Sequence, residues 1–386
     1  MRKLVGFLVA LIIAGSAFGA APGKRIDWSK VKKTVFCSIM LNYGTAKGPT
    51  KEYAGWSAAG CRPGVVLDKK TGRRDMPMLY QPMVGPYDQK DPRTIKYHMD
   101  MADRMGIDSW AVWYWPPLDK ASKVHRNNMK LYMDYIEKHH RRVKVCAVMD
   151  NAFFPVGVEL KLFKDWTADD VVKHAVYVLK NFASRPSYFK YEGRPVMFMY
   201  GTWIFRDHHK PVDWDYVLNK IRKHGYDPIF IVEVGPEMSL EVCPGGEGQF
   251  KSCGSYYQKL MTIFEGVFNV CQIGYGGLKD FNRANVWKAG VKAASEKNAL
   301  YMPNPSAGYH TYLWEKPPAT IFDVPRKDGQ HYSDTWQDAS NSGARWIFLH
   351  TWNEWYENTQ LEPALDYKYL YVDLTRKWIK KFKSEK

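Results

Sequence analysis

Eight short apolar segments recur along the chain, and a segment with a helical pattern follows each of them. Their expected bounds are 34–44, 109–115, 143–150, 195–201, 228–235, 266–274, 299–305 and 345–352. Each segment is continuously apolar, which is typical of parallel strands buried on both faces of a sheet. This alternation predicts an α/β fold, a single-domain (β/α)8 or TIM barrel. An open doubly wound sheet is the alternative, but no glycine-rich phosphate turn follows the first segment.

The clearest helical pattern has Asp91 as its N-cap and Pro92 at its first helical position, and Gly106 ends it. The other helical patterns cover 127–139, 169–184, 213–224, 254–264, 283–297, 333–343 and 367–383. Because no internal repeat or linker is present, we expect one catalytic domain over 21–386. The Gly- and Pro-rich insertion 45–90, after the first strand, is expected to fold over the mouth of the barrel.

Residues 1–20 have the pattern of a signal peptide. Arg2 and Lys3 precede an apolar stretch, 4–15, that is too short to span a bilayer, and small residues near Ala20 offer a cleavage site. We therefore expect a secreted or periplasmic protein with no membrane anchor after cleavage, and a monomer. Export separates the protein from nucleic acid, and no nucleic-acid reader motif is present.

The chain carries a net charge of +16, which removal of Arg2 and Lys3 with the leader would lower to +14. A basic exported protein can attract anionic partners, such as sulfated or uronic polysaccharide. Much of this charge can equally serve solubility. The aromatic share of 15% is consistent with flat ring faces that pack on sugars, or with an aromatic-rich core.

Export also permits disulfide bonds among the six cysteines. Cys243 and Cys253 flank a Gly-rich loop and form the best candidate pair, whereas Cys37 and Cys61 form a weaker one. The two remaining cysteines lie inside apolar segments, which indicates buried thiols; they are Cys146 and Cys271. No Cys or His spacing indicates a zinc site, and we expect neither a metal nor another cofactor.

In a (β/α)8 barrel the active site lies at the carboxyl ends of the strands. There the chain places carboxylates, amides and aromatic rings, which together are typical of a carbohydrate site. Cleavage of a glycosidic bond requires a proton donor and a second carboxylate, and the candidates are Glu233, Glu237 and Glu354. The candidate sugar-binding residues at the strand ends are Trp113, Tyr114, Trp115, Asp150, Asn151, Tyr200, Trp203, Tyr309, His310, His350, Trp352 and Asn353.

Each candidate also has a structural alternative. Glu233 interrupts an apolar strand, where an unpaired carboxylate is costly, so a functional role is favoured. Glu354 follows the last strand and could instead hold neighbouring loops, and Asp150 could cap the segment that follows it. Glu237 follows a proline in a loop, and position alone does not decide its role. The tryptophans at the strand ends could merely plug the barrel.

Four segments follow one another along the chain, "GPYDQKDPRTIKYHMDMADRMGIDSWAVWYWPP", "FEGVFN", "YMPNPSAGYHTYLWEKPP" and "WNEW…TQLEPA". From about Gly85 to Tyr371, this ordered set resembles the family-99 glycoside hydrolases, the endo-α-mannosidases. The last segment, with "YKYL", is equally similar to the WbsX-like proteins, which have been described as glycosyltransferases of polysaccharide loci. Tyr87 in the first segment and Glu362 in the last are further candidates for sugar binding.

The resemblance implies a (β/α)8 barrel that acts on α-mannoside-like glycans without metal-dependent chemistry. In that family two glutamates near the end of strand five are expected to act. One deprotonates the substrate's 2-hydroxyl to give a 1,2-anhydro sugar, and the other is an acid and then a base. Glu233 lies at the position of the first glutamate. The tight glutamate pair of the family is not reproduced around Glu237, so Glu354 is the alternative acid.

We therefore predict a secreted glycoside hydrolase that cleaves an α-linked, mannoside-like glycan, with anionic polysaccharide among the substrates considered. Arg206, His208 and Lys279 are candidate contacts for sulfate or carboxylate, and Glu357 is expected to bind sugar hydroxyls or to brace its loop. A WbsX-like glycosyltransferase is one alternative. The signal peptide opposes it, because nucleotide-sugar donors are cytoplasmic. A non-catalytic glycan-binding barrel is the other, and it would tolerate the loss of either acid.

Overall fold

The computed structural model describes most of the chain between residues 26 and 385. The described residues are 26–57, 60–115, 120–151, 154, 158, 164–202, 212–234, 255–268, 270, 282–310 and 323–385, without the side chains of 120–126 and 255–258. No helix among them is long and apolar enough to cross a membrane.

Eight parallel strands of this described part follow one another in the order β11-β1-β2-β3-β5-β6-β7-β8. Their bounds are β1 Thr34–Ile39, β2 Ser109–Tyr114, β3 Lys144–Asp150, β5 Arg194–Tyr200, β6 Ile229–Glu233, β7 Gly266–Phe268, β8 Leu300–Met302 and β11 Trp346–Leu349. The Phe348 N–H donates to the Pro303 carbonyl at 3.0 Å, which brings the two outer strands together. The predicted (β/α)8 barrel is thereby confirmed.

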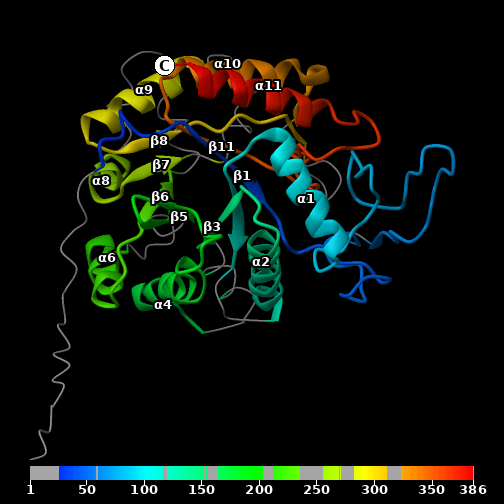
Figure 1. The fold of residues 1–386 in the computed structure, drawn as a ribbon, viewed down its shortest axis with the longest axis horizontal. Coiled ribbons are helices and arrows are strands. Elements are labelled where there is room, and N and C mark those ends of the chain that lie inside the picture. The colour runs from blue at the N-terminus through cyan, green and yellow to red at the C-terminus, as the bar shows by residue number, and fades with distance from the viewer. Residues whose placement is uncertain are drawn as a thin grey trace, which may run out of the picture.

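Helices surround these strands (Figure 1). They are α1 Pro92–Met105, α2 Lys120–Lys138, α4 Ala168–Val178, α6 Trp214–Lys223, α8 Ser255–Ile263, α9 Arg283–Glu296, α10 Gln330–Asn341 and α11 Leu370–Ser384. In α1 the Asp91 side chain accepts from the Arg93 N–H at 2.8 Å, and Gly106 ends the helix with a φ of 83°. Both predicted end signals are therefore confirmed, since an αL residue without a Cβ ends a helix at low cost.

Shorter elements complete the described part of the fold. A π-helical turn, Leu179–Ala183, extends α4, and a 3-10 turn, Lys327–Gly329, precedes α10. The two-residue strand β4, Lys190–Tyr191, pairs with β5. Strands β9, Tyr309–His310, and β10, Asp323–Val324, pair with each other in antiparallel orientation.

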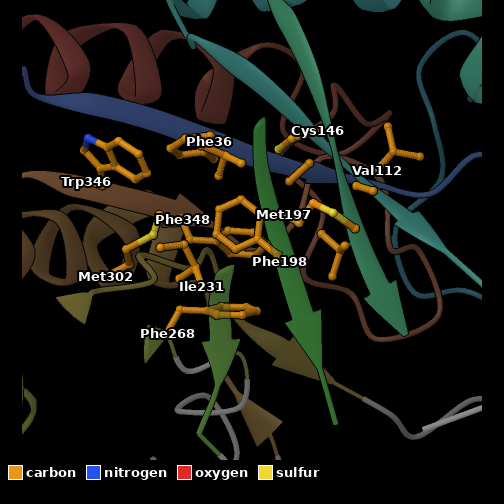
Figure 2. Close-up of a cluster of buried hydrophobic side chains, with 14 of the residues drawn as sticks. Phe36, Val112, Cys146, Met197, Phe198, Ile231, Phe268, Met302, Trp346 and Phe348 are labelled. Atoms are coloured by element: carbon orange, nitrogen blue, oxygen red, sulfur yellow. The ribbon is translucent and has the colours of Figure 1, made fainter. Parts of the chain in front are cut away.

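Four phenylalanines fill the interior of the barrel, and Figure 2 shows them gathered between the strands. Phe36 and Phe198 have ring centroids 5.2 Å apart, and Phe268 and Phe348 have centroids 4.8 Å apart. Phe198 contacts both of the latter rings, at 5.3 and 5.0 Å. All four are fully buried, so the barrel is a packed core and not a pore.

An aromatic cluster lies at the amino end of the barrel, where the Trp346 ring is 5.2 Å from that of Phe36. The Trp346 ring lies 5.2 Å from Trp28, 5.7 Å from Tyr191 and 6.0 Å from Phe189. The Trp346 indole N–H donates to the carbonyl of Lys32 at 3.2 Å, so its single polar atom is satisfied. We call Trp28, Phe189, Tyr191 and Trp346 the amino-end plug.

The long insertion between β1 and α1 packs against the segment that follows β11. The Met83 N–H donates to the Pro363 carbonyl at 2.9 Å, and the Leu365 N–H donates to the Gln81 carbonyl at 2.9 Å. The insertion and this segment share a second apolar cluster, which comprises Tyr43, Trp56, Met76, Met78, Tyr87, Trp355 and Ala364. These contacts attach the insertion to the carboxyl side of the barrel; its covering of the mouth stays a prediction.

The described cysteines are free thiols, so the weaker predicted pair, Cys37 with Cys61, is wrong. Cys37 is fully buried within a barrel strand, whereas Cys61 is partly exposed in the insertion beside Asp75, so no bond between them forms. Cys146 is a buried thiol, as expected, and burial raises its pKa to about 12. The preferred pair, Cys243 with Cys253, lies outside the described residues.

Candidate active site

A tight turn after β11 carries two neighbouring glutamates, Glu354 and Glu357. The Glu354 N–H donates to the hydroxyl of Thr351 at 2.8 Å, and the hydroxyls of Thr351 and Thr359 are 3.0 Å apart. The Tyr356 N–H donates to the Glu354 carboxylate at 3.2 Å. Both ends of the turn are thus tied together, and both glutamates project from the same short segment. We call residues 351–359 the glutamate turn.

The two glutamates differ in their electrostatic surroundings. Burial, and after it the negative charge of Glu357, raise the pKa of Glu354 to about 8, against the lowering effect of the Tyr356 N–H. Glu354 therefore holds a proton at neutral pH. The Glu357 carboxylate is 32% exposed and lies 3.5 Å from Nε2 of His350, which is almost completely buried. The turn thus presents a protonated acid next to a second carboxyl that reaches solvent.

Glu357 was not among the carboxylates predicted to be catalytic, whereas Glu354 was. A usable signal is present in the sequence "NEWYE", because two glutamates three residues apart in one turn come close in space. The structure also brings the predicted sugar-binding residue His310 to this turn. The His310 N–H donates to the Glu357 carbonyl at 2.9 Å, and the Asn358 side-chain amide donates to the His310 carbonyl at 2.6 Å.

Glu233 lies at the carboxyl end of β6 and is fully buried. Its Oε2 accepts from the Gly201 N–H at 3.3 Å, and its carbonyl accepts from the Thr202 hydroxyl. These bonds tie the end of β6 to the residues that follow β5. The structure thus places Glu233 at the predicted end of the barrel, and its catalytic role stays a prediction.

The ends of β2, β3 and β5 converge beside one another. The rings of Trp113 and Tyr200 meet edge to face, with centroids 4.8 Å apart. Asp150 is the register partner of Tyr200, and the Asn151 N–H donates to the Tyr200 carbonyl at 3.2 Å. Asn151 is fully buried and Trp113 nearly so, whereas Trp115, Asp150, Tyr200, Tyr309 and His310 are half-buried.

Two predicted sugar-binding residues, Tyr114 and Trp352, are fully buried, and their contact with sugar stays a prediction. Tyr114 is fully buried, and its ring stacks on His174 with centroids 5.5 Å apart. Trp352 is also fully buried and packs on Trp110 and His98, at 5.6 and 5.8 Å. Neighbouring residues of a strand point to opposite faces, so Tyr114 turns outward where Trp113 turns inward.

Three further predicted sugar contacts lie in a buried network behind the glutamate turn. The Tyr87 hydroxyl donates to Oε2 of Glu362 at 2.8 Å, and the Asn353 side-chain amide donates to the Tyr87 oxygen at 3.0 Å. Asn353 and Glu362 have no exposed surface, and Tyr87 is 7% exposed. These hydrogen bonds engage Tyr87, Asn353 and one oxygen of Glu362 inside the protein, and contact of the three residues with sugar stays a prediction.

Several predicted site residues lie outside the described part of the chain. They are Trp203, Arg206, His208, Glu237 and Lys279. Within the part that the structure describes, no group of three or more His, Cys, Asp or Glu side chains could hold a metal ion.

Comparison with known proteins connects this geometry to one enzyme family. The family model described as glycosyl hydrolase family 99 matches residues 56–384. The chain belongs to glycosyl hydrolase family 99. The predicted resemblance is confirmed, and this family-99 chain is a glycoside hydrolase.

Two relatives of the family-99 chain carry endomannosidase names. The "Glycoprotein endo-alpha-1,2-mannosidase-like protein" of Danio rerio is 24% identical over 356 residues, which cover 84% of this chain and 72% of that protein. The "Glycoprotein endo-alpha-1,2-mannosidase" of Rattus norvegicus is 22% identical over 337 residues, which cover 81% of this chain and 65% of that protein. The chain thus spans about two thirds to three quarters of the length of these two relatives.

A solved structure of a GH99 endo-alpha-mannosidase from Bacteroides thetaiotaomicron, in complex with bis-tris-propane, has the same fold. It aligns with a TM-score of 0.67 at 20% identity and covers 90% of this chain and 97% of that chain. A structure titled "Glycoside hydrolase-like protein" aligns with a TM-score of 0.59 at 12% identity. At these identities the two likenesses establish the barrel and leave the substrate open.

Proposed function

We propose that this family-99 hydrolase cleaves an α-mannoside-like linkage within a glycan and that Glu354 and Glu357 are its acid–base pair. The observation that carries the proposal is the glutamate turn, where burial and the charge of Glu357 raise the pKa of Glu354 to about 8. A pair that holds one proton near neutral pH meets the requirement for a proton donor and a base in one place. The endomannosidase names of the relatives support the choice of substrate.

The proposed reaction moves one proton through the pair. The protonated carboxyl gives its proton to the glycosidic oxygen as the bond between that oxygen and the anomeric carbon breaks. The ionised carboxylate accepts a proton from the hydroxyl that attacks the anomeric carbon, which belongs to water or to the sugar itself. At the end of a turnover the pair again holds one proton. His350 lies against Glu357 and holds that carboxylate in place.

The residues at the converging strand ends supply the proposed sugar contacts. Trp113 and Tyr200 form one aromatic corner, and Trp115 and Tyr309 are half-buried rings that can cover a sugar face. Asp150 is proposed to accept from sugar hydroxyls. We also propose a catalytic or substrate-holding role for Glu233. Asn151 and His310 are proposed as further sugar contacts.

The proposed activity is tested by incubating the purified protein with α-mannans, sulfated glycans and uronic glycans and measuring released oligosaccharides. We expect release from an α-mannoside-containing glycan and loss of release in a Glu354→Gln, Glu357→Gln double variant. Release from the anionic glycans would support an anionic substrate, which the charge of +14 after leader removal motivates. Binding to a glycan without any release would favour a non-catalytic barrel and overturn the proposal.

A substrate that carries an activated aryl leaving group distinguishes the role of the acid from the role of the base. Such a leaving group departs without protonation, so the variant that lacks the acid keeps most of its activity on this substrate. The variant that lacks the base loses activity on both kinds of substrate. Equal losses of Glu354→Gln and Glu357→Gln on both substrates would contradict a division of labour between the two carboxyls.

Export is proposed from the leader pattern of residues 1–20. Expression of the full chain, cell fractionation and N-terminal sequencing test it. We expect a mature protein that begins near Ala21 and is found outside the cytoplasm. An intact leader on a cytoplasmic protein would contradict this part of the proposal.

A further inference from the structure

The two residues on either side of Glu354 are anchored inside the protein. The Asn353 side chain makes two hydrogen bonds with the backbone of Met40. It accepts from the Met40 N–H at 2.7 Å and donates to the Met40 carbonyl at 2.9 Å. Trp355 donates its indole N–H to Oε2 of Glu362 at 3.2 Å. Both side chains are fully buried. The direction of Glu354 is therefore set by residues that cannot themselves reach a substrate.

Glu362 connects these two anchors to each other. Its Oε2 accepts from Trp355 and also from the Tyr87 hydroxyl, at 2.8 Å. The same hydroxyl oxygen accepts from the side-chain amide of Asn353 at 3.0 Å. One buried carboxylate oxygen thus joins the residue before Glu354 to the residue after it.

The other oxygen of Glu362 faces helix α1. Its Oε1 lies 3.6 Å from Nε2 of His98, whose Nδ1 is 2.6 Å from the hydroxyl of Tyr132. Tyr132 donates to the side chain of Gln89, which in turn donates to the Met40 carbonyl at 2.9 Å. The network therefore returns to Met40, the backbone anchor of Asn353, and links the glutamate turn to α1, to α2 and to the residue that follows β1.

A fully buried carboxylate is a costly way to fill space, because apolar side chains of similar volume pack without desolvation of a charge. Directed hydrogen bonds, in contrast, define the angles of the groups they join. Burial and the charge of Glu362 raise the pKa of Tyr87 well above its usual range, so this hydroxyl stays a donor. The network is thus better suited to fixing a geometry than to adding stability.

We infer that Tyr87 and Glu362 are positioning residues, which fix the orientation of Glu354 through its two neighbours, Asn353 and Trp355. This inference rests on the proposed function of the pair. It replaces the predicted contact of these two residues with sugar by an action through Asn353 and Trp355. Removal of the Tyr87 hydroxyl leaves Oε2 of Glu362 with one donor and loosens both flanks of Glu354.

The variant Tyr87→Phe tests the inference, with Tyr188→Phe as its matched control. Tyr188 is 2% exposed and donates to the Val196 carbonyl at 3.0 Å, so each change removes one bonded hydroxyl from a buried ring. We expect similar losses of thermal stability in both variants. Only Tyr87→Phe should lower kcat, by about tenfold, with KM unchanged, because small displacements of a catalytic group are costly. Carboxyl-carbon NMR of labelled glutamate should show a changed pKa of Glu354 in Tyr87→Phe alone.

Three results would contradict the positioning role of Tyr87 or the proposed function on which it rests. A raised KM with unchanged kcat in Tyr87→Phe would show a sugar contact and overturn the inference. Identical kcat, KM and Glu354 titration in Tyr87→Phe and Tyr188→Phe would show a purely structural role and also overturn it. A wild-type protein without hydrolase activity would overturn the proposed function, and the NMR titration would still show whether the network sets the geometry of the pair.

Discussion

The two ends of the barrel differ in the side chains that they carry, which are aromatic at the amino end and include carboxyl groups at the carboxyl end. At the amino end, Trp346 at the start of β11 packs in the aromatic amino-end plug, and its one polar atom is bonded to a backbone carbonyl. Just past the other end of the same strand, His350 contacts Glu357, and Glu354 sits in surroundings that raise its pKa. One end therefore contributes packing, whereas the other keeps partly buried carboxyls close together at a cost in stability. Changes at the two ends should separate stability from activity.

The largest expected effect comes from Glu357→Gln at the carboxyl end. Loss of this carboxylate removes one partner of the proposed pair and should lower kcat by about 10³-fold with the melting temperature nearly unchanged. Steady-state kinetics and thermal melting measure the two effects. The control is Glu296→Gln, an exposed change on α9 that should leave both values as they are. Full activity of Glu357→Gln would remove this residue from the mechanism.

Trp346→Phe at the amino end should have the opposite pattern. It removes the indole N–H bond to Lys32 and part of the ring volume in the amino-end plug. We expect a loss of about 1–2 kcal/mol in the free energy of unfolding. Denaturant unfolding measures this loss, and kcat of the folded variant should equal that of the wild type. A fall in kcat as large as the one in Glu357→Gln would erase the distinction between the two ends.

The pH dependence of the free energy of unfolding tests how much the buried Glu354 carboxyl at the carboxyl end destabilises the fold when it ionises. The folded-state pKa of Glu354 is raised from the ordinary 4.5 to about 8, so its contribution to stability is complete below 4.5 and is lost as pH rises toward 8. One such proton changes the free energy of unfolding by up to about 1.4 kcal/mol per pH unit. Urea unfolding at several pH values should show a shallower decline in Glu354→Gln than in the wild type. Parallel curves would mean that Glu354 ionises normally.

The smallest effect is expected from a change that belongs to neither end. Lys130 and Asp134 form an exposed ion pair on α2 at 2.8 Å. Lys130→Ala should lower the free energy of unfolding by less than about 0.5 kcal/mol, because solvent screens exposed pairs. Urea unfolding should barely separate this variant from the wild type, and its kcat should be unchanged. A loss equal to that of Trp346→Phe would show that burial does not govern these differences.

The barrel itself could be predicted from the sequence, because its strands are continuous apolar runs. The strand predicted at 109–115 forms as Ser109–Tyr114, and the one at 143–150 forms as Lys144–Asp150. The predicted strand 299–305 is too long, since β8 is Leu300–Met302. The predicted carboxyl ends of the strands extend too far. At the mouth of the barrel the backbone leaves the hydrogen-bonded ladder, while the side chains of the sequence are still apolar.

The site was harder to predict, because a strand buried on both faces does not reveal which residues point inward. Trp113 and Tyr114 are adjacent aromatic residues, and only the register with the neighbouring strands assigns them to opposite faces. Glu362 could not be separated from a sugar-binding acid, since its partners come from distant segments, among them Tyr87 and His98. The structure places Glu354 in the turn that follows β11, where the sequence predicts it, and its catalytic role stays a proposal.

The pH profile of kcat/KM tests the central claim most directly, since it reports whether Glu354 and Glu357 share one catalytic proton. With the glycan that the substrate panel identifies, kcat/KM should fall as pH rises through about 8, where Glu354 loses its proton. The profile of Glu296→Gln should follow the wild type. A kcat/KM that stays constant through this range would contradict the claim that a protonated Glu354 takes part in catalysis.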